Sequence, residues 1–291
     1  VVDVTYEGHA MSDLDRMIID KPADGIFRIH RSAMTSPEIL QMEQERIFNK
    51  SWLYVGHESE LENPGDYRRR SVAGRPLFFV RGNDGKVRVF LNTCTHKGAV
   101  ICRHDEGHAD ILQCFYHAWS FNNHGDLVGV PDEAGYGHSF NRAAMGLKSP
   151  PRVEDYRGFI FISFNPDVED LVSYLAGARE YLDLVVDQAE HGMRIIAGSN
   201  RYSIKANWKL LVENSLDGYH VKPTHKSYFD YVTGLGVKRG AVQTAFSRPA
   251  RALGNGHAVE EHDGVRGRPI ARWSPLFGEE NKEEITAIRS R

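Results

Sequence analysis

The chain has 291 residues, of which 41% are hydrophobic and 26% charged, so it predicts two ordinary folded domains and excludes a long disordered or low-complexity chain. Its formal net charge of −3 lacks the positive field of a nucleic-acid-binding protein, so we expect no nucleic-acid partner. No apolar stretch has the length of a membrane span, and the first residues lack a secretory signal, so we expect a cytoplasmic protein that does not enter a membrane. Three cysteines in a reducing compartment point to metal binding or catalysis rather than to disulfides.

The first expected element is a helix over Ser36–Phe48, since a serine N-cap and a proline in the first turn precede it. Its expected apolar face consists of Ile39, Leu40, Ile47 and Phe48. Between Trp52 and Phe164 the pattern changes to short β-rich runs separated by turns. Pro76–Arg81 and Lys86–Leu91 flank an Asn-Asp-Gly turn and predict a hairpin, and Gly158–Phe164 predicts a buried strand. This part of the chain is typical of a small all-β domain.

Beyond this segment the apolar spacing becomes helical, and a second domain is expected. The pattern predicts a helix over Asp170–Gln188, a strand over Arg194–Lys205 and a helix over Trp208–Asp217. Gly234–Gly267 is rich in glycine and reads as a loop. The tail, Glu279–Arg291, predicts an amphipathic helix that stops without a glycine or asparagine cap.

Two pairs of ligand-type residues stand out in the β-rich segment: Cys94 with His96, and Cys114 with His117. The arrangement is C-x-H-x17-C-x-x-H, and the chance that both cysteines have a histidine at these offsets is about 0.002. A Cys2His2 zinc site is one alternative, although zinc fingers favour wider spacing within each pair. A two-iron cluster fits better, with one Cys and one His from each loop and the two histidines on the same iron. Cys102 has no matching histidine and is expected to be a buried structural cysteine.

A second group of polar residues follows the NWK sequence at 207–209. On a continuous helix Asn214, Asp217 and His220 share one face, which we expect to be buried, and His225 returns after Pro223, which stops the helix. Taken alone, such residues are more often surface residues or a hydrogen-bonded core pair than a metal site.

The two motifs CTHKGA and CFYHAWSF resemble the Rieske [2Fe–2S] box of ring-hydroxylating oxygenase large (alpha) subunits. The resemblance implies that the cluster ligands are Cys94, His96, Cys114 and His117. Tyr116, Trp119 and Phe121 are expected to cover the cluster. Ala118 stands where the family usually has glycine, a departure expected to tighten the loop.

The segment D-x2-H-x4-H after NWK-x3-EN resembles the mononuclear iron segment of the same family. That resemblance implies that His220 and His225 are two ligands of a mononuclear Fe(II) in a 2-His-1-carboxylate site. Asp217 is implied to link the two centres, with hydrogen bonds to His220 and, across a subunit boundary, to His117. Asn214 is implied to lie close to the iron. The third ligand of the family, an aspartate well downstream, has no counterpart in this sequence.

The fold implied by the resemblance is α+β, with an all-β Rieske [2Fe–2S] domain inserted in a helix-grip-like catalytic domain built from an antiparallel sheet with helices. Residues 1–45 are the expected N-terminal part of the catalytic domain, 46–165 the Rieske domain and 166–291 the mononuclear-iron part. Because the third ligand is missing, we expect a catalytic domain that is truncated at its C-terminal end.

The activity implied by the resemblance is that of an aromatic ring-hydroxylating dioxygenase, which converts an arene and O2 to a cis-dihydrodiol. A Rieske monooxygenase or demethylase, an electron carrier or inactive remnant, and a zinc-stabilised module are the alternatives. The chain has no dinucleotide-binding motif, so NAD(P)H is expected to act through a separate ferredoxin or flavin reductase. A small (beta) subunit and a homotrimer of alpha subunits (α3 or α3β3) are further implied. The expected substrate-pocket residues, which could equally be ordinary core, are Tyr219, Tyr228, Phe229 and Tyr231.

Overall fold

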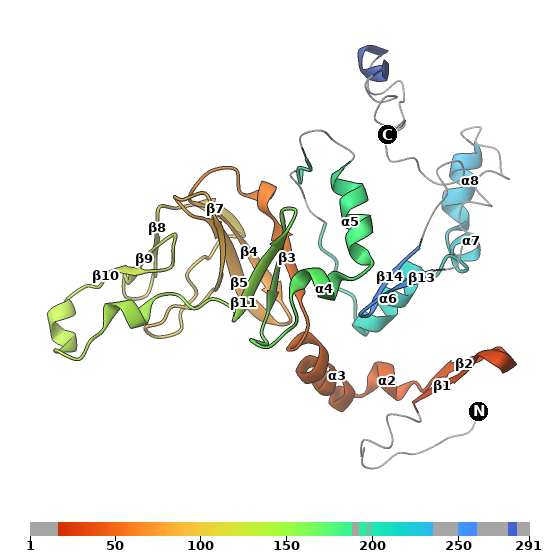
Figure 1. The fold of residues 1–291 in the computed structure, drawn as a ribbon, viewed down its shortest axis with the longest axis horizontal. Helices are drawn as coiled ribbons and strands as arrows, with labels where there is room; N and C mark the ends of the chain where they lie inside the picture. Colours follow the sequence, from red (N-terminus) through yellow and green to blue (C-terminus); the bar gives the residue numbers. More distant parts are fainter. Residues whose placement is uncertain are drawn as a thin grey trace.

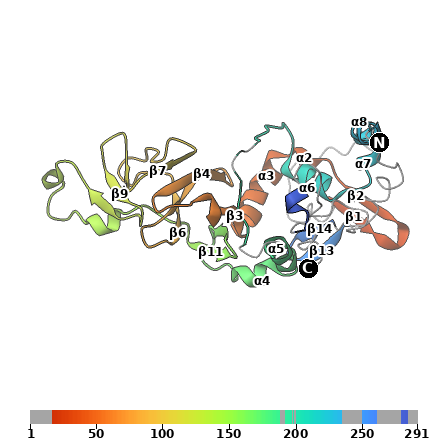
Figure 2. The same cartoon turned by 90° about the horizontal axis from the view of Figure 1, so that it is seen from above.

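The structure is a computed structural model, and it describes residues 17–187, 192–196, 198, 200–234, 250–260 and 279–283. The molecule is elongated: antiparallel strands form one end, and helices with two small hairpins form the other (Figures 1 and 2). No helix among the described residues is both long enough and apolar enough to cross a membrane.

The N-terminal segment contains a hairpin followed by helices. Its elements are β1 (Ile18–Lys21), η1 (Pro22–Asp24), β2 (Ile26–Ile29), α2 (Ser32–Thr35), α3 (Pro37–Glu43) and η2 (Gln44–Phe48). The hydroxyl of Ser36 accepts a hydrogen bond from the N–H of Ile39 at 3.3 Å, which confirms the predicted N-cap. The predicted helix continues to Phe48, but η2 is a π-helical turn. Of the expected apolar face, Ile39 is buried, whereas Leu40 and Ile47 are exposed.

Three antiparallel sheets make up the β-rich end, with strand orders β6-β5-β4-β7, β11-β12-β3 and β10-β9-β8. The strands are β3 (Leu53–His57), β4 (Asp66–Val72), β5 (Arg75–Arg81), β6 (Val87–Leu91), β7 (Glu106–His108), β8 (Ile111–Gln113), β9 (Ser120–Asn122), β10 (Leu127–Gly129), β11 (Arg152–Tyr156) and β12 (Phe159–Ser163). The short 3-10 helices between them are η3 (Glu58–Glu60), η4 (Glu133–Tyr136) and η5 (Arg142–Met145). The predicted hairpin and the predicted strand at 158–164 are both present.

Strand β5 separates two hydrophobic cores because successive side chains on a strand point to opposite faces. Leu77 and Phe79 pack into the core shared with β3 and β12, and Phe78 and Val80 pack into the core that contains Cys94 and its neighbours. These four side chains of β5 are fully buried. One face of the β6-β5-β4-β7 sheet therefore packs into the core that contains the two loop cysteines.

The helix predicted over Asp170–Gln188 is two helices, α4 (Leu171–Leu175) and α5 (Ala178–Val186), and Gln188 lies outside the described residues. The carboxylate of Asp170 caps α4 by accepting from the N–H of Ser173 at 2.9 Å. The break falls at Ala176, whose φ of +44° is incompatible with a right-handed helix.

The remaining elements are α6 (Trp208–Leu216), α7 (Val221–Thr224), α8 (Lys226–Gly234), β13 (Arg251–Gly254), β14 (His257–Val259) and η7 (Glu279–Asn281). The strand predicted over Arg194–Lys205 was wrong for the described residues there, because no described strand offers it the hydrogen-bonded partner that a strand needs. The predicted loop Gly234–Gly267 contains the β13–β14 hairpin. Within that range, the structure describes only residues 234 and 250–260. Of the predicted tail helix, only 279–283 is described.

Candidate metal centres

The two Cys–His loops have the same backbone geometry. In each loop the cysteine N–H donates to the carbonyl five residues later at 2.8 Å, and the cysteine carbonyl accepts from the N–H four residues later at 2.9 Å. The residue at that fourth position, Gly98 in one loop and Ala118 in the other, has φ of +76° and +55°. This left-handed conformation suits glycine and strains alanine. The tightening expected at Ala118 is therefore a strained turn in a loop shape that both loops share, and the two loops present Cys94 and Cys114 in the same way.

The two cysteines converge in the buried core. Cys94 and Cys114 are each 2% exposed, both are free of disulfide bonds, and both belong to the same hydrophobic core cluster. Burial raises the pKa of the Cys94 thiol, and the adjacent Cys114 raises it further, whereas the N–H groups of His96 and Lys97 lower it. Two buried thiolates side by side require a compensating positive charge, which a metal supplies.

The two histidines of these loops lie close to each other. The rings of His96 and His117 have centroids 4.6 Å apart, and the indole of Trp119 stacks on His96 at 4.7 Å with an interplanar angle of 8°. The buried Nδ1 of His96 has no hydrogen-bond partner, as a nitrogen intended for a metal would not. Burial, followed by His117 and Lys97, lowers the pKa of His96 and favours the neutral imidazole that binds metals.

These four side chains fit a [2Fe–2S] cluster with two cysteine and two histidine ligands. Among the described residues, no three or more His, Cys, Asp or Glu side chains surround a common point, so these four side chains do not form a single-ion Cys2His2 site. A Rieske cluster requires only two protein ligands at each of its two irons. The observed pairing of thiols and the observed pairing of imidazoles satisfy that requirement, and this disfavours the zinc alternative.

Two further residues support the first loop, and the sequence analysis missed both. Tyr136 of η4 has its hydroxyl 3.4 Å from Nε2 of His96 and its ring against Trp119. Asn92 is 1% exposed, and its Oδ1 accepts from the N–H groups of Ile101 (3.1 Å) and Cys102 (2.8 Å). Its Nδ2 donates to the Cys102 carbonyl at 2.9 Å, which closes the loop. Neither Tyr136 nor Asn92 belongs to a spaced sequence pattern. The only signal in the sequence for Asn92 is its position two residues before Cys94.

The remaining expectations around the cluster are mixed. Trp119, one of the residues expected to cover the cluster, stacks on His96, and Phe121 is buried in the same core as the two cysteines. Tyr116 lies against His117, with ring centroids 3.9 Å apart, but it is largely exposed. Cys102 is buried as predicted, and burial raises its pKa to about 12.

The second group of residues does not lie on one continuous helix, so that expectation was wrong. Helix α6 ends at Leu216, Asp217 is extended, and His220 stands just before α7. Pro223 does not stop this helix but lies inside α7, where its missing N–H is not needed in the first turn. The expected buried row was also wrong, because Asn214 is exposed and the Asp217 side chain is 47% exposed.

Asp217 and His220 nevertheless contact each other. Oδ1 of Asp217 accepts from the N–H groups of Tyr219 (2.8 Å) and His220 (3.3 Å), which leaves Oδ2 3.2 Å from Nδ1 of His220. Desolvation alone raises the pKa of Asp217, but the two N–H groups and the His220 ring outweigh it and lower the pKa below its ordinary value. The carboxylate is therefore ionised and placed to orient the imidazole.

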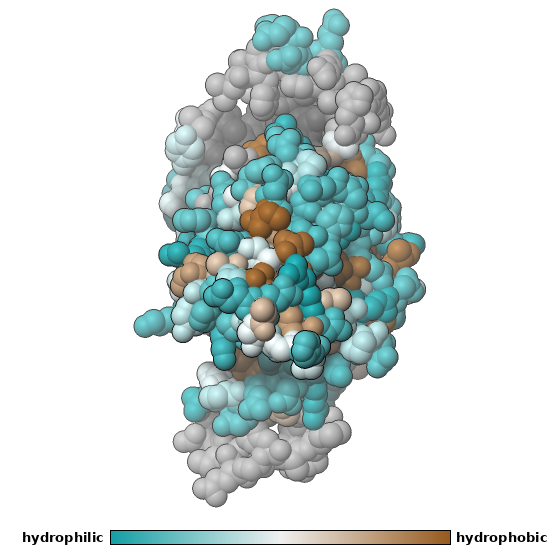
Figure 3. Space-filling view, turned by 90° about the vertical axis from the view of Figure 1, so that its left-hand side faces the viewer, coloured by the Kyte–Doolittle hydropathy of each residue, from teal (hydrophilic) through white to brown (hydrophobic). Residues whose placement is uncertain are grey.

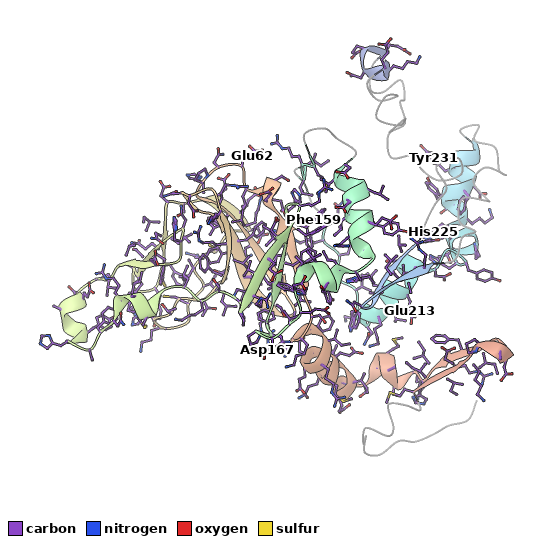
Figure 4. All side chains as sticks on the ribbon, viewed as in Figure 1. Glu62, Phe159, Asp167, Glu213, His225 and Tyr231 are labelled. Carbon is purple, nitrogen blue, oxygen red and sulfur yellow. The ribbon has the colours of Figure 1, made fainter. Side chains whose placement is uncertain are left out.

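His220 and His225 are close enough to bind one ion. Their ring centroids are 5.4 Å apart. A histidine nitrogen binds a metal at about 2.1 Å and the ring centre lies about 1.1 Å further, so two such centroids are at most about 6.4 Å apart. Figure 4 labels His225 beside α7, with Glu213 of α6 and Tyr231 of α8 on either side. Among the described residues, no group of three or more His, Cys, Asp or Glu side chains is arranged to hold a metal ion.

The aromatic residues expected near this site do not form ordinary core. Tyr219 is 95% exposed, and Tyr228 and Tyr231 are also exposed. Phe229 is half-buried against Tyr228, with ring centroids 5.7 Å apart.

The fold and the paired Cys–His loops define a Rieske-type iron–sulfur protein, and comparisons with known proteins agree. The Rieske [2Fe-2S] domain family matches residues 51–151, and the family "Ring hydroxylating alpha subunit (catalytic domain)" matches residues 180–282. The chain belongs to the alpha-subunit family of Rieske ring-hydroxylating oxygenases. The cofactors of this family are those that the sequence predicted, a Rieske [2Fe–2S] cluster and a mononuclear iron.

Individual relatives are dioxygenase subunits. The chain is 37% identical to toluate 1,2-dioxygenase subunit alpha of Pseudomonas putida over 74% of this chain and 48% of the relative. It is 38% identical to a benzene 1,2-dioxygenase subunit alpha of Pseudomonas putida over 85% and 56%. Naphthalene 1,2-dioxygenase from Rhodococcus sp. superimposes with a TM-score of 0.67 at 35% identity, over 69% of this chain and 46% of that one. The chain thus spans about half the length of the relatives it matches.

Proposed function

We propose that this chain is part of the alpha subunit of an aromatic ring-hydroxylating dioxygenase, an oxidoreductase that cis-dihydroxylates an arene with O2. The observation that carries the proposal is the presence of both centres in one chain: the four paired cysteines and histidines, and the Asp217–His220–His225 group. The dioxygenase names of the toluate, benzene and naphthalene relatives support it. When bound, the cluster and the iron supply one-electron transfer and reactivity toward O2.

The chain's own residues have distinct roles in this proposal. The cluster ligands are Cys94, His96, Cys114 and His117, and the iron ligands in this chain are His220 and His225. Trp119 stacks on the ring of His96, and the carboxylate of Asp217 lies 3.2 Å from Nδ1 of His220, where it favours one orientation of that ring. Asp217 also remains the proposed link to His117 of a neighbouring subunit, with Asn214 near the iron.

We further propose that 1–45 and 166–291 belong to one catalytic domain and that 46–165 is inserted between them. Support comes from Glu43, at the end of α3, which contacts Trp208 and Lys209 at the start of α6. A cytoplasmic location is proposed as well, because Cys94 and Cys114 must remain reduced to bind a cluster.

The partners proposed are a ferredoxin or flavin reductase that donates electrons, a beta subunit, a trimer of alpha subunits, and an aromatic substrate. An exposed apolar area at the cluster end supports a protein partner. Figure 3 faces that end and shows apolar residues gathered near its centre. Exposed apolar residues beside the cluster loops include Val100, Ile111 and Phe115, and the guanidinium of Arg103 lies over the Phe115 ring at 5.0 Å.

The test uses the holoprotein, a reductase system and ¹⁸O₂ with toluate, benzene and naphthalene as trial substrates. A dioxygenase places both atoms of one ¹⁸O₂ into the product, whereas a monooxygenase places one. Incorporation of a single ¹⁸O atom with every trial arene would favour the monooxygenase alternative. That alternative is supported by a structural likeness to a quaternary ammonium Rieske monooxygenase (TM-score 0.61, 31% identity).

Substitutions separate the two centres. We expect Cys114→Ser to abolish the visible absorption of the cluster, and His225→Ala to keep that absorption but lose the mononuclear iron. His104→Ala, at an exposed histidine of the same β-rich segment, is the matched control and should retain both. Retention of mononuclear iron in both His220→Ala and His225→Ala would contradict the assigned ligands.

A further inference from the structure

Glu43 is a buried acidic side chain at the junction of α3 and the π-helical turn η2. Its side chain is 11% exposed, and its two oxygens contact residues more than 160 positions away in the sequence. Oε2 accepts the indole N–H of Trp208 at 2.8 Å, and Oε1 forms an ion pair with Nζ of Lys209, whose side chain is also mostly buried. A buried carboxylate is costly unless it is paired and hydrogen-bonded, and Glu43 is both.

These contacts hold the first turn of α6. Asn207 caps this helix, with Oδ1 accepting from the N–H of Lys209 at 3.1 Å. The ring of Phe48, from η2, packs edge-on against Trp208 with centroids 5.1 Å apart. The negative charge of Glu43 near a helix N-terminus is also favourable, because the helix dipole is positive there. Cap, ion pair, indole hydrogen bond and ring contact therefore act on a single turn.

The opposite end of α6 leads into the second candidate metal centre. The helix has nine residues and therefore a length of about 13.5 Å, and Asp217 follows its last residue directly. None of its residues is buried, and Leu210, Leu211 and Val212 are exposed, so its described contacts are concentrated at the Trp208–Lys209 end. A helix held at one end transmits a shift of that end along its whole length.

We propose that Glu43 is a positioning residue for the mononuclear iron site. It acts through Trp208 and Lys209 to set α6, and so to set Asp217 against His220. This inference rests on the proposed function, since it concerns the iron held by His220 and His225. The sequence NWK before the ligand segment then serves as an anchor on the N-terminal helix, with no contact of its own to the iron.

The experiment compares Glu43→Gln, Glu43→Ala and the exchanged pair Glu43→Lys/Lys209→Glu in the holoprotein. Glu43→Gln keeps an acceptor for the indole but removes the charge opposite Lys209, whereas Glu43→Ala removes both. Glu45→Gln is the matched control, because Glu45 is an exposed acid two residues along. The readouts are Fe(II) affinity of the mononuclear site, the electron paramagnetic resonance spectrum of its complex with nitric oxide, and the visible absorption of the cluster.

We expect Glu43→Ala to weaken Fe(II) binding at the mononuclear site by 10- to 100-fold, the usual range for supporting residues of a metal site, with cluster absorption unchanged. Glu43→Gln should fall between Glu43→Ala and the parent. The exchanged pair restores the ion pair but offers the indole N–H of Trp208 no acceptor, so it should regain part of the lost affinity. Parent-like affinity in Glu43→Ala, equal loss of the cluster, or no recovery in the exchanged pair would overturn the inference. If the parent protein binds no iron that His220→Ala removes, the proposed function itself fails.

Discussion

Replacing Asn92 tests whether the first cluster loop depends on a single buried side chain. Asn92→Ala removes three hydrogen bonds, of 2.8, 2.9 and 3.1 Å, and leaves the N–H groups of Ile101 and Cys102 and the carbonyl of Cys102 without these partners. Each net bond is worth about 1 kcal/mol, and each buried group left unsatisfied costs about 1–3 kcal/mol. At the lower figure of about 1 kcal/mol for each of the three groups, the free energy of unfolding should fall by about 3 kcal/mol or more, a large part of the 5–15 kcal/mol typical of a domain.

The assay is denaturant unfolding of the holoprotein, followed by cluster absorption. Asn200→Ala, at an exposed asparagine, is the control and should change the unfolding free energy by about 0.5 kcal/mol or less. Asn92→Asp should also destabilise, because a carboxylate cannot donate to the Cys102 carbonyl and adds a buried charge. A loss below about 1 kcal/mol in Asn92→Ala would refute the reasoning, since it would mean that water or a shifted backbone satisfies the loop equally well.

Three further predictions concern the same domain. Gly98→Ala should lower the unfolding free energy by about 1 kcal/mol through backbone strain alone, because its added Cβ meets nothing within 4 Å. Ala118→Gly should not destabilise the protein. A thermal melt in which Gly98→Ala is no less stable than the parent, or Ala118→Gly is less stable, would contradict the argument. The Tyr136 hydroxyl, as an acceptor at Nε2 of His96, makes that imidazole a more basic ligand and so lowers the reduction potential of the cluster. Tyr136→Phe should therefore raise the potential. An unchanged potential in a redox titration would show that Tyr136 does not tune the cluster. For Cys102, whose pKa is raised from 9.0 to about 12, the folded state favours the thiol, so the stabilisation is present below pH 9 and lost between pH 9 and about 12. Denaturation across that range should show this decline, and Cys102→Ala should reduce the slope.

Contacts between residues close in sequence were predictable. The Ser36 cap, the β5–β6 hairpin and the paired Cys–His loops each depend on side chains within a few residues of one another, so spacing alone predicts them. The break in the helix at Ala176 was not predictable from spacing, because the apolar periodicity continues across it and only the backbone conformation interrupts it.

The second metal centre shows the limit of periodicity. A three-residue step from Asp217 to His220 suggested one helix face, yet the helix ends before Asp217. The two side chains meet because Asp217 caps the N–H groups of Tyr219 and His220 in a turn. The spacing allowed either geometry, and the same two residues are neighbours in both.

By itself, the sequence determined the candidate ligand types, the shared backbone shape of the two Cys–His loops, and the alternation of side chains that buries both faces of β5. These features depend on local chemistry and on the two-residue period of a strand. Only the tertiary structure decided which residues support the ligands. Tyr136 reaches His96 from 40 residues away, and Glu43 reaches Trp208 from 165 residues away. Contacts at such separations depend on how the chain folds back on itself, and no local pattern encodes that path.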